Sequence, residues 1–307
     1  MRDKLLIGLG TYKRPLMLEK ALTSLQDLKF PDFYDVFLLV CDNDANGSSR
    51  ETVERINLSF EVYYKIEPRQ GIVNMRNAIL NFANNEGFDL LTFFDDDEVV
   101  SPQWLVEIVS CMQFYGVEAV HGHVDFIFPE TSRSPFVKKY YPGMLKKQTG
   151  DDLKVAYTNN VLINLEFVRT NNLTFNPKFN LTGGSDTLFF RTLKDLGGKI
   201  VYCREALVSE FVPETRTSIE WLLTRHYRNG YVSYLIQKER TVKVYRIITE
   251  IMIVIKFWIM KMKLPLHIQD INTYKRFKRI KNRRKTLGRY HALKQIPFEE
   301  YTEIHGE

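Results

Sequence analysis

Cysteine is scarce in this chain of 307 residues, which contains only three. Cys41, Cys111 and Cys203 are widely spaced, and each lies in or beside an apolar run. Isolated thiols form neither a disulfide framework nor a zinc site, and they are typical of a reducing cytosol. The sequence therefore excludes a small disulfide-stabilised scaffold and a cysteine-rich metal domain.

Long hydrophobic segments are also missing. No window reaches the roughly 20 uninterrupted apolar residues that a bilayer-spanning helix needs. The apolar run at residues 5–9 is followed at once by a turn and is too short for the core of a signal peptide. We therefore expect a cytoplasmic protein without a membrane-spanning helix or a secretory leader.

Acidic residues are nearly absent from one part of the chain. Residues 251–294 hold thirteen Lys and Arg residues against the single acid Asp270, a charge of +12 in a chain whose net charge is +6. The remainder is therefore mildly acidic. A basic segment on an acidic body indicates a negatively charged partner, either a membrane surface or nucleic acid.

The composition, 44% hydrophobic and 26% charged, is that of an ordinary globular protein. The first hundred residues alternate strand-like and helix-like segments. Helices are expected after Pro15 and Gly71, and strands at 4–9, 35–41, 61–66 and 90–94. This rhythm predicts an α/β fold, with a mostly parallel sheet flanked by helices.

The next part of the chain is less regular. We expect strands at 118–128 and 161–164 and helices around 104–112 and at 219–237. A further helix is expected to begin after a capping Ser185 and to end at Gly197. Residues 129–153 are polar and punctuated by proline and glycine, which predicts a loop or lid.

Polar clusters follow three of the expected strands, at the edge where open parallel sheets bind ligands. They are Thr11-Tyr12-Lys13-Arg14, Asp42-Asn43-Asp44 and Asp95-Asp96-Asp97-Glu98. Adjacent carboxylates repel one another, and a divalent cation would offset that cost. Their hard oxygen atoms suit Mg²⁺ or Mn²⁺, which commonly bridge carboxylates to phosphates. A solvated acidic turn is the alternative.

Further motifs follow in order. They are Glu67-Pro68-Arg69-Gln70-Gly71-Ile72, Arg76-Asn77, Leu181-Thr182-Gly183-Gly184-Ser185-Asp186-Thr187, and Trp221-Leu222-Leu223 with Arg225, Arg228 and Gly230. Together with the strand-end clusters, they make residues 4–235 similar to family 2 glycosyltransferases of the GT-A fold. Within that family, the sequence resembles the bacterial exopolysaccharide glucosyltransferase-like group.

The resemblance implies that the first motifs bind the nucleotide of a sugar donor. Thr11, Tyr12 and Asp42 match base-binding positions, where Tyr12 would stack on the base and Asp42 would accept from it. The expected nucleotide-binding set is completed by Arg14, Asp44, Arg76, Asp95 and Asp96. Structural alternatives are that Tyr12 covers the sheet edge, Asp42 caps a turn and Arg76 pairs with a surface acid.

The resemblance also implies the chemistry. Asp97 would be the ligand of Mn²⁺ or Mg²⁺, and Asp186 would be the base that deprotonates the acceptor hydroxyl during inversion. Relatives usually carry Glu-Asp where this chain has Ser185-Asp186, so the aspartate is kept and the preceding acid is lost. The alternative is that Asp186 only complements the N-terminus of a helix.

Several other side chains are weaker candidates. Arg225 and Arg228 share one helix face and would clamp a phosphate group, unless that face is simply solvated. His226 and Glu210 are candidates for completing the metal or acceptor site. His121 and His123, on one face of a strand, are expected to be structural or to line the acceptor site.

These features and the resemblance predict an inverting glycosyltransferase that moves a hexose from a UDP-sugar to a hydroxyl of a growing, lipid-linked bacterial surface glycan. The expected domain is 1–235, with a nucleotide-binding half to residue 100 and an acceptor half from 101. Residues 236–307 are expected to form a helical, basic extension that faces the inner side of the cytoplasmic membrane. A helix packed on the domain with a solvated basic face is the alternative.

Three other functions stay open. A nucleotidyltransferase would need a phosphate loop, of which Gly8-Leu9-Gly10-Thr11 is a poor version. A non-catalytic sugar-nucleotide-binding protein would not need Asp97 and Asp186. A nucleic-acid-binding protein would use the basic tail, but no recognised motif accompanies it and the carboxylates would be unexplained. We therefore expect no nucleic-acid partner.

Overall fold

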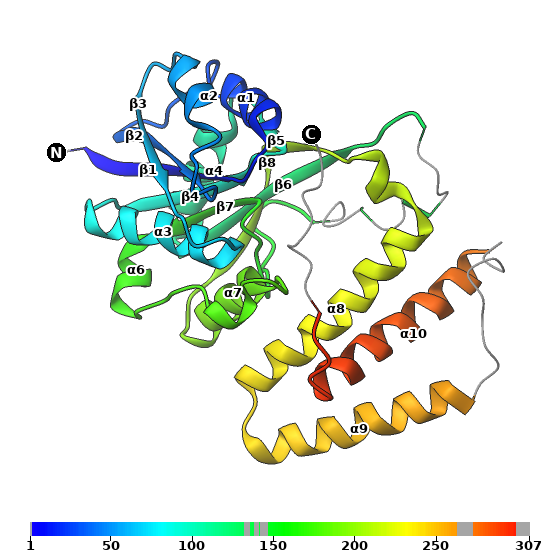
Figure 1. Cartoon of the computed structure of the whole chain (residues 1–307). Coiled ribbons are helices and arrows are strands. Elements are labelled where there is room, and N and C mark those ends of the chain that lie inside the picture. Colours follow the sequence, from blue (N-terminus) through cyan, green and yellow to red (C-terminus); the bar gives the residue numbers. More distant parts are fainter. Residues whose placement is uncertain (1, 132–135, 138–140, 142–146, 263–272, 299–307) are drawn as a thin grey trace.

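The centre of the computed structural model is an eight-stranded sheet (Figure 1). The structure describes residues 2–131, 136–137, 141, 147–262 and 273–298. In spatial order the strands are β3 (Glu61–Ile66), β2 (Tyr34–Asp42), β1 (Asp3–Thr11), β4 (Leu90–Asp95), β7 (Asn160–Asn164), β6 (Ala119–Ile127), β8 (Ile200–Phe211) and β5 (Glu98–Val100). Only β7 and β5 run against the other described strands. The expected mostly parallel α/β sheet is confirmed.

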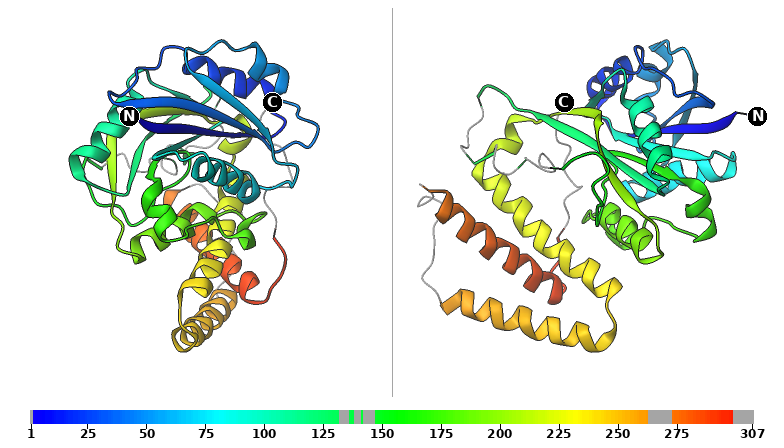
Figure 2. Two further views of the ribbon diagram at one scale, coloured as in Figure 1. Left: turned by 90° about the vertical axis from the view of Figure 1, so that its left-hand side faces the viewer. Right: turned by 180° about the vertical axis from the view of Figure 1, so that it is seen from behind.

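Helices cover both faces of the sheet (Figure 2). One face packs against α3 (Ile72–Asn85), α6 (Leu165–Thr170) and α7 (Ser185–Asp195), and the other against α1 (Pro15–Ser24), α2 (Arg50–Arg55) and α4 (Trp104–Tyr115). The alternation of β1 explains the two layers, because Leu6 enters the first core whereas Leu5 and Ile7 enter the second.

Two glycines in β1 let α3 lie close to the sheet. A Cβ at Gly8 would lie 2.6 Å from Cγ2 of Ile79, and one at Gly10 would lie 2.3 Å from the Met75 side chain. Both glycines are therefore packing positions within a strand rather than parts of a phosphate-binding loop. The feature that most resembled a nucleotidyltransferase has this structural explanation.

Most expected elements are confirmed, although the short elements α2, β5 and α6 were not predicted. The strand β8 was not predicted, because Arg204 and Glu205 interrupt its apolar pattern where the register with β6 shifts. The expectation that Ser185 caps a helix was wrong: Ser185 is the first residue of α7, and Gly184 precedes it with a φ of +90°. Much of the expected lid at 129–153 lies outside the described residues.

Three long helices end the described chain: α8 (Ile219–Arg240), α9 (Lys243–Met262) and α10 (Tyr274–Leu293). They lie side by side, away from the sheet (Figures 1 and 2). Val232 and Ile236 of α8 join the core beneath α3 and α7. The expected domain boundary at residue 235 falls inside α8, so this division of the chain stays a prediction. None of the helices described here is long and apolar enough to span a bilayer.

The helices α8 and α10 cross at two glycines. A Cβ on Gly230 would lie 2.0 Å from the carbonyl oxygen of Lys285, and a Cβ on Gly288 would lie 2.0 Å from that of Tyr227. The two backbones are therefore in contact, which only glycine permits. This crossing fixes α10 to α8, the helix that joins the core beneath α3 and α7.

Candidate active site

The sheet register brings the three polar clusters to one edge. Thr11 at the end of β1 lies beside Asp42 of β2, and Gly10 lies beside Asp95 of β4. Because these strands are parallel, their carboxyl ends meet there, as in other open α/β sheets.

Asp96 holds the turn after β1 against the acidic segment. The Thr11 hydroxyl donates to Oδ2 of Asp96 at 2.8 Å, and the Arg14 guanidinium donates to Oδ1 at 3.0 Å. Asp96 is buried, and residues of this turn donate hydrogen bonds to both of its oxygens. The three residues therefore have a structural role, whether or not they also contact a nucleotide.

Two arginines flank Asp97. Its Oδ2 lies 3.7 Å from Arg14 and 3.6 Å from Arg216, and Arg216 also donates to Oε1 of Glu210 at 3.4 Å. Sequence reasoning missed Arg216, because it lies in a short 3-10 turn, η2 (Glu214–Thr217), that follows the unpredicted strand β8. It did single out Glu210, which the structure adds to the acidic cluster.

Burial and mutual repulsion make Asp95, Asp96 and Glu210 resist ionisation. Burial, and then the charge of Asp97, raise the pKa of Asp95 to about 7. Burial raises the pKa of Asp96 to about 6, although Arg14 opposes the change. Burial and Asp97 likewise raise the pKa of Glu210 to about 7. Clustered groups with perturbed pKa values are a property of functional sites.

Glu98 has one carboxylate oxygen that forms no hydrogen bond with a described residue. Its Oε2 accepts from the backbone N–H of Asp95 at 2.8 Å, whereas its buried Oε1 accepts from no described residue. Burial raises its pKa well above the usual value. Carboxylate oxygens suit Mg²⁺ or Mn²⁺, but no three potential ligand side chains are gathered into a metal site in the described part of the chain. The cluster fits a cation that is held by a carboxylate together with ligand oxygens.

Asp186 lies in the first turn of α7, beside this cluster. Its Oδ1 accepts from the backbone N–H of Thr187 at 2.6 Å, and no residue that the structure describes donates to its Oδ2. Burial raises the pKa of Asp95 and lowers that of His121; the charge of Asp186 adds to the first change and opposes the second, which places these groups in one neighbourhood. A half-buried carboxylate with one available oxygen is the arrangement that a general base needs.

Arg76 connects α3 to the start of α7. It is buried, and it donates to Oγ of Ser185 at 3.0 Å. Its positive charge also opposes the rise in the pKa of Asp95. Ser185 is therefore the partner of Arg76. This contact differs from the structural alternative, in which Arg76 pairs with a surface acid, and the predicted role of Arg76 in nucleotide binding stays a prediction. This contact positions the turn that carries Asp186.

Asp42 is fully buried and organises the turn after β2. It accepts from the backbone N–H groups of Asp44 and Ser49 at 2.9 and 2.8 Å, and from the Tyr64 hydroxyl at 2.7 Å. These contacts fit the turn-capping alternative. Asp44 is buried in the same turn, and Tyr12 lies half-buried at the adjacent strand end. Their roles in nucleotide binding stay predictions.

The two arginines expected to form a clamp have different contacts, and their role in phosphate binding stays a prediction. Arg225 lies 5.8 Å from the ring centre of Trp221, and its charge opposes the rise in the pKa of Glu210, so it lies on the side of the acidic cluster. Arg228 is buried and donates through Nε to the carbonyl of Thr182 at 3.2 Å. It therefore ties α8 to the loop before α7.

The histidines have different surroundings. His226 packs edge-to-face against Phe277 of α10, away from the acidic cluster. Nδ1 of His123 lies 2.5 Å from the hydroxyl oxygen of Tyr202. His121 is buried in β6 near Asp186, so it is the histidine placed to influence the site.

Replacing His121 should change the acid sensitivity of the fold. Burial lowers its pKa from 6.5 to about 4, and its Nδ1 donates to the carbonyl of Gly122 at 2.7 Å. The native state therefore binds fewer protons than the unfolded state between these values, and stability is lost as the pH falls through this range. As the pH falls from about 7 to about 4, the free energy of unfolding should decrease by about 3 kcal/mol less in His121→Gln than in wild type. Denaturant titrations at a series of pH values measure this difference.

The comparison of the two proteins isolates this contribution. The buried carboxyl groups act with the opposite sign, since they gain stability on acidification, but they are present in both proteins and cancel. Parallel pH profiles for wild type and variant would contradict the assignment of a neutral, buried His121.

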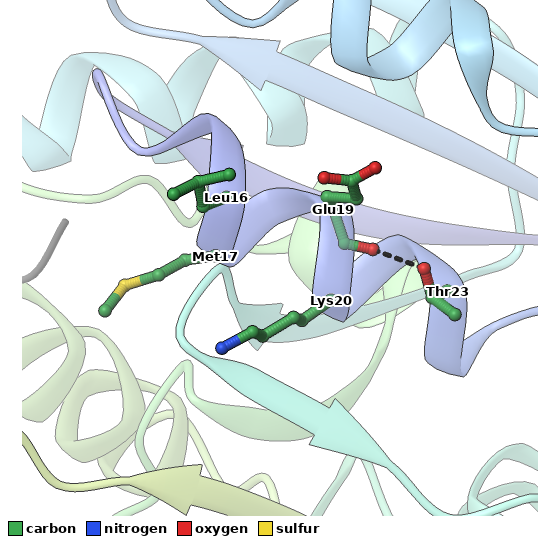
Figure 3. A pocket seen from close by; sticks show the side chains of 5 residues that line it. All are labelled: Leu16, Met17, Glu19, Lys20 and Thr23. Carbon is green, nitrogen blue, oxygen red and sulfur yellow. Dashed lines mark hydrogen bonds between the residues drawn. The ribbon is translucent and has the colours of Figure 1, made fainter.

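A separate cavity of about 420 Å³ lies against α1 and is not this site (Figure 3). The described residues that line it all belong to that helix: Leu16, Met17, Glu19, Lys20 and Thr23. The hydrogen bond drawn there joins the Thr23 hydroxyl to the backbone carbonyl of Glu19, at 2.7 Å, within the helix. No convergent set of catalytic groups accompanies it among these residues.

A mostly parallel sheet with carboxylates at its strand ends, faced by an aspartate at the start of a helix, is the arrangement that the sequence predicted for a glycosyltransferase of the GT-A type. Residues 7–196 match the profile of glycosyl transferase family 2, and the chain belongs to that family. It is 34% identical over 226 residues to the succinoglycan biosynthesis protein ExoM of Rhizobium meliloti (strain 1021). That match covers 73% of this chain and 72% of ExoM.

Solved structures support the same fold. TarS 1-349 of S. aureus in complex with UDP-GlcNAc matches with a TM-score of 0.57 and 13% identity, over 95% of this chain and 90% of the TarS 1-349 chain. The mannosyltransferase PcManGT of Pyrobaculum calidifontis, in complex with GDP-Man and Mn²⁺, matches with a TM-score of 0.55 and 12% identity, over 95% and 74% of the two chains. At these identities the similarity establishes the GT-A-like fold alone.

Proposed function

We propose that this glycosyltransferase is inverting, and that it moves a hexose from a UDP-sugar to a hydroxyl of a growing bacterial surface glycan. The observation that carries the proposal is the position of Asp186, which has an available oxygen beside the buried carboxylates at the sheet edge. The relationship to a succinoglycan biosynthesis protein supports a glycan acceptor. The fold shared with a UDP-GlcNAc complex is compatible with a UDP-sugar.

In the proposed reaction, Asp186 is the general base. Its Oδ2 takes the proton of the acceptor hydroxyl while the hydroxyl oxygen attacks the anomeric carbon. The bond from that carbon to the diphosphate breaks on the opposite face, and the nucleoside diphosphate leaves with the electron pair. An α-linked donor therefore gives a β-linked product. The hydrogen bond from Thr187 to Oδ1 orients the carboxylate for this step.

The acidic cluster is proposed to bind the donor diphosphate with Mn²⁺ or Mg²⁺. Asp97 would hold the cation, and the bound cation would neutralise the negative charge of the departing diphosphate. Arg14, Arg216 and Arg225 lie on the same side of the site and would supply further positive charge. Asp95 is proposed to orient the donor.

We further propose that the enzyme works at the inner face of the cytoplasmic membrane, on a lipid-linked acceptor. The charge of +12 over residues 251–294 supports attraction to an anionic membrane surface. The proposed partners are thus a UDP-sugar, a glycan acceptor and anionic lipid.

Calorimetric titration with UDP, GDP and their sugar derivatives tests the donor site. In Mn²⁺, wild type should bind UDP or one UDP-sugar, and chelation with EDTA should weaken that binding. Asp97→Asn should lower the affinity in Mn²⁺ by at least about tenfold, because the substitution removes the charge of the proposed ligand.

Asp32→Asn, at an exposed position far from the sheet edge in sequence, is the matched control and should bind as wild type does. Preference for a GDP-sugar would overturn the UDP assignment. Failure to bind any nucleotide, with or without Mn²⁺, would contradict the proposed donor site.

A further inference from the structure

A second pocket lies among the three C-terminal helices, far along the chain from the acidic cluster. Its volume is about 380 Å³, and α8, α9 and α10 all contribute to its walls. Three basic side chains line it, Lys256 of α9 and Lys285 and Arg289 of α10, whereas no Asp or Glu is among its described lining residues. Such a pocket is suited to an anion.

Arg289 has hydrogen-bonding capacity that the described protein does not use. One of its terminal nitrogens donates to Oε1 of Gln237 at 2.8 Å, but its buried Nε donates to no described residue. A buried donor without an acceptor is costly, and a guanidinium group favours oxyanions that accept from two of its nitrogens. The missing acceptor is therefore best supplied by a ligand such as a phosphate group.

The pocket adjoins an exposed apolar helix face. Ile251, Met252, Ile255 and Trp258 of α9 are 54%, 49%, 52% and 57% exposed. Met252 also lines the pocket, so the pocket meets the edge of this face. Lys256 follows on the same side of the helix. An apolar face bordered by basic residues, with a tryptophan among them, is typical of helices that lie in a membrane interface.

We propose that this pocket binds the phosphate group of an anionic phospholipid, and that the exposed face of α9 enters the same bilayer beside it. The inference deepens the proposed membrane location by naming the site and its ligand. A second copy of this chain is a poorer occupant, because a symmetric interface would bring two segments of charge +12 together. A phospholipid surface supplies both the negative charge and the apolar environment.

Vesicle flotation with two matched triple variants tests the proposal. The pocket variant combines Lys256→Gln, Lys285→Gln and Arg289→Gln. The control variant combines Lys275→Gln, Lys278→Gln and Arg279→Gln, which removes the same charge from α10 at exposed positions outside the pocket. On phosphatidylcholine vesicles containing phosphatidylglycerol, the pocket variant should lose at least about tenfold more affinity than the control. Equal losses would show diffuse attraction and overturn the pocket.

Two further measurements identify the ligand. Brominated acyl chains should quench the fluorescence of Trp258, and the quenching should disappear in Trp258→Phe; absence of quenching in wild type would overturn insertion of α9. Inorganic phosphate that binds as tightly as the vesicles would overturn the lipid assignment. Thermal unfolding and nucleotide titration of both triple variants should match those of wild type. Failure of the lipid-binding proposal is therefore distinguishable from failure of the proposed donor site.

Discussion

Asp186→Asn should lower the rate constant of sugar transfer by about 10²–10⁴-fold, while the affinity for the donor stays within about twofold of wild type. The amide is nearly the same size and can still accept the hydrogen bond that Thr187 donates to Oδ1. It cannot take a proton from the acceptor hydroxyl. The loss should therefore appear in single-turnover transfer rates rather than in calorimetric donor binding.

Asp195→Asn is a suitable control for this experiment. It makes the same substitution at the other end of α7, where the carboxylate forms an ion pair with Arg240. Exposed ion pairs contribute about 1 kcal/mol or less, so folding and transfer should change little. A near-normal rate in Asp186→Asn would place the base elsewhere, and a parallel loss of donor binding would make Asp186 a binding residue.

The position of Asp186 depends on contacts from two directions. Arg76 reaches Ser185 from α3, and Arg228 holds the carbonyl of Thr182 from α8. A Cβ at Gly184 would lie 2.2 Å from Val232, so the loop also packs closely on α8. Asp186 is therefore positioned by contacts from both α3 and α8, so the motif around Gly183 and Gly184 and Arg228 of α8 belong to one structural unit.

The parallel part of the fold could be predicted because its signals are local. Buried strands such as β1 are continuous apolar runs, and α3 shows a clear helical period. The strand β8 lacks such a signal, because its bulge exposes Arg204 and Glu205 in the middle of its length. Its pairing with β6 is a long-range property that a single sequence pattern does not contain.

The same distinction applies to the candidate site. Asp95, Asp96 and Asp97 are adjacent in sequence, so their repulsion and their position after a strand could be recognised. The approach of Arg216 to Asp97 could not, because the two residues meet only when β8 has paired with β5. The directions of the side chains could not be predicted either. The i, i+3 spacing of Arg225 and Arg228 predicts a shared face, but not that Arg225 lies over Trp221 of its own helix while Arg228 donates to the loop before α7.

Gly288→Ala should destabilise the packing of α10 on α8, by about 3 kcal/mol. On an isolated helix, alanine would be favoured over glycine by about 1 kcal/mol. Here the added Cβ would lie 2.0 Å from the carbonyl oxygen of Tyr227 and 2.9 Å from the backbone nitrogen of Tyr231. Helical backbone cannot turn aside as a flexible side chain can, so the two helices must separate. Denaturant unfolding and the rate of proteolysis within α10 measure the effect.

Asn229→Ala separates the close contact from helix propensity, because it adds alanine at an exposed position of α8 next to Gly230 and should be neutral or slightly stabilising. Gly230→Ala meets the carbonyl of Lys285 from the other helix, so its effect should add only partly to that of Gly288→Ala. Once the first methyl group has separated the helices, the second has less contact to disrupt.

Unchanged stability in Gly288→Ala would contradict the close crossing. A loss of vesicle binding with intact nucleotide binding would show that the crossing holds the basic pocket together, since the same residue, Lys285, forms part of both.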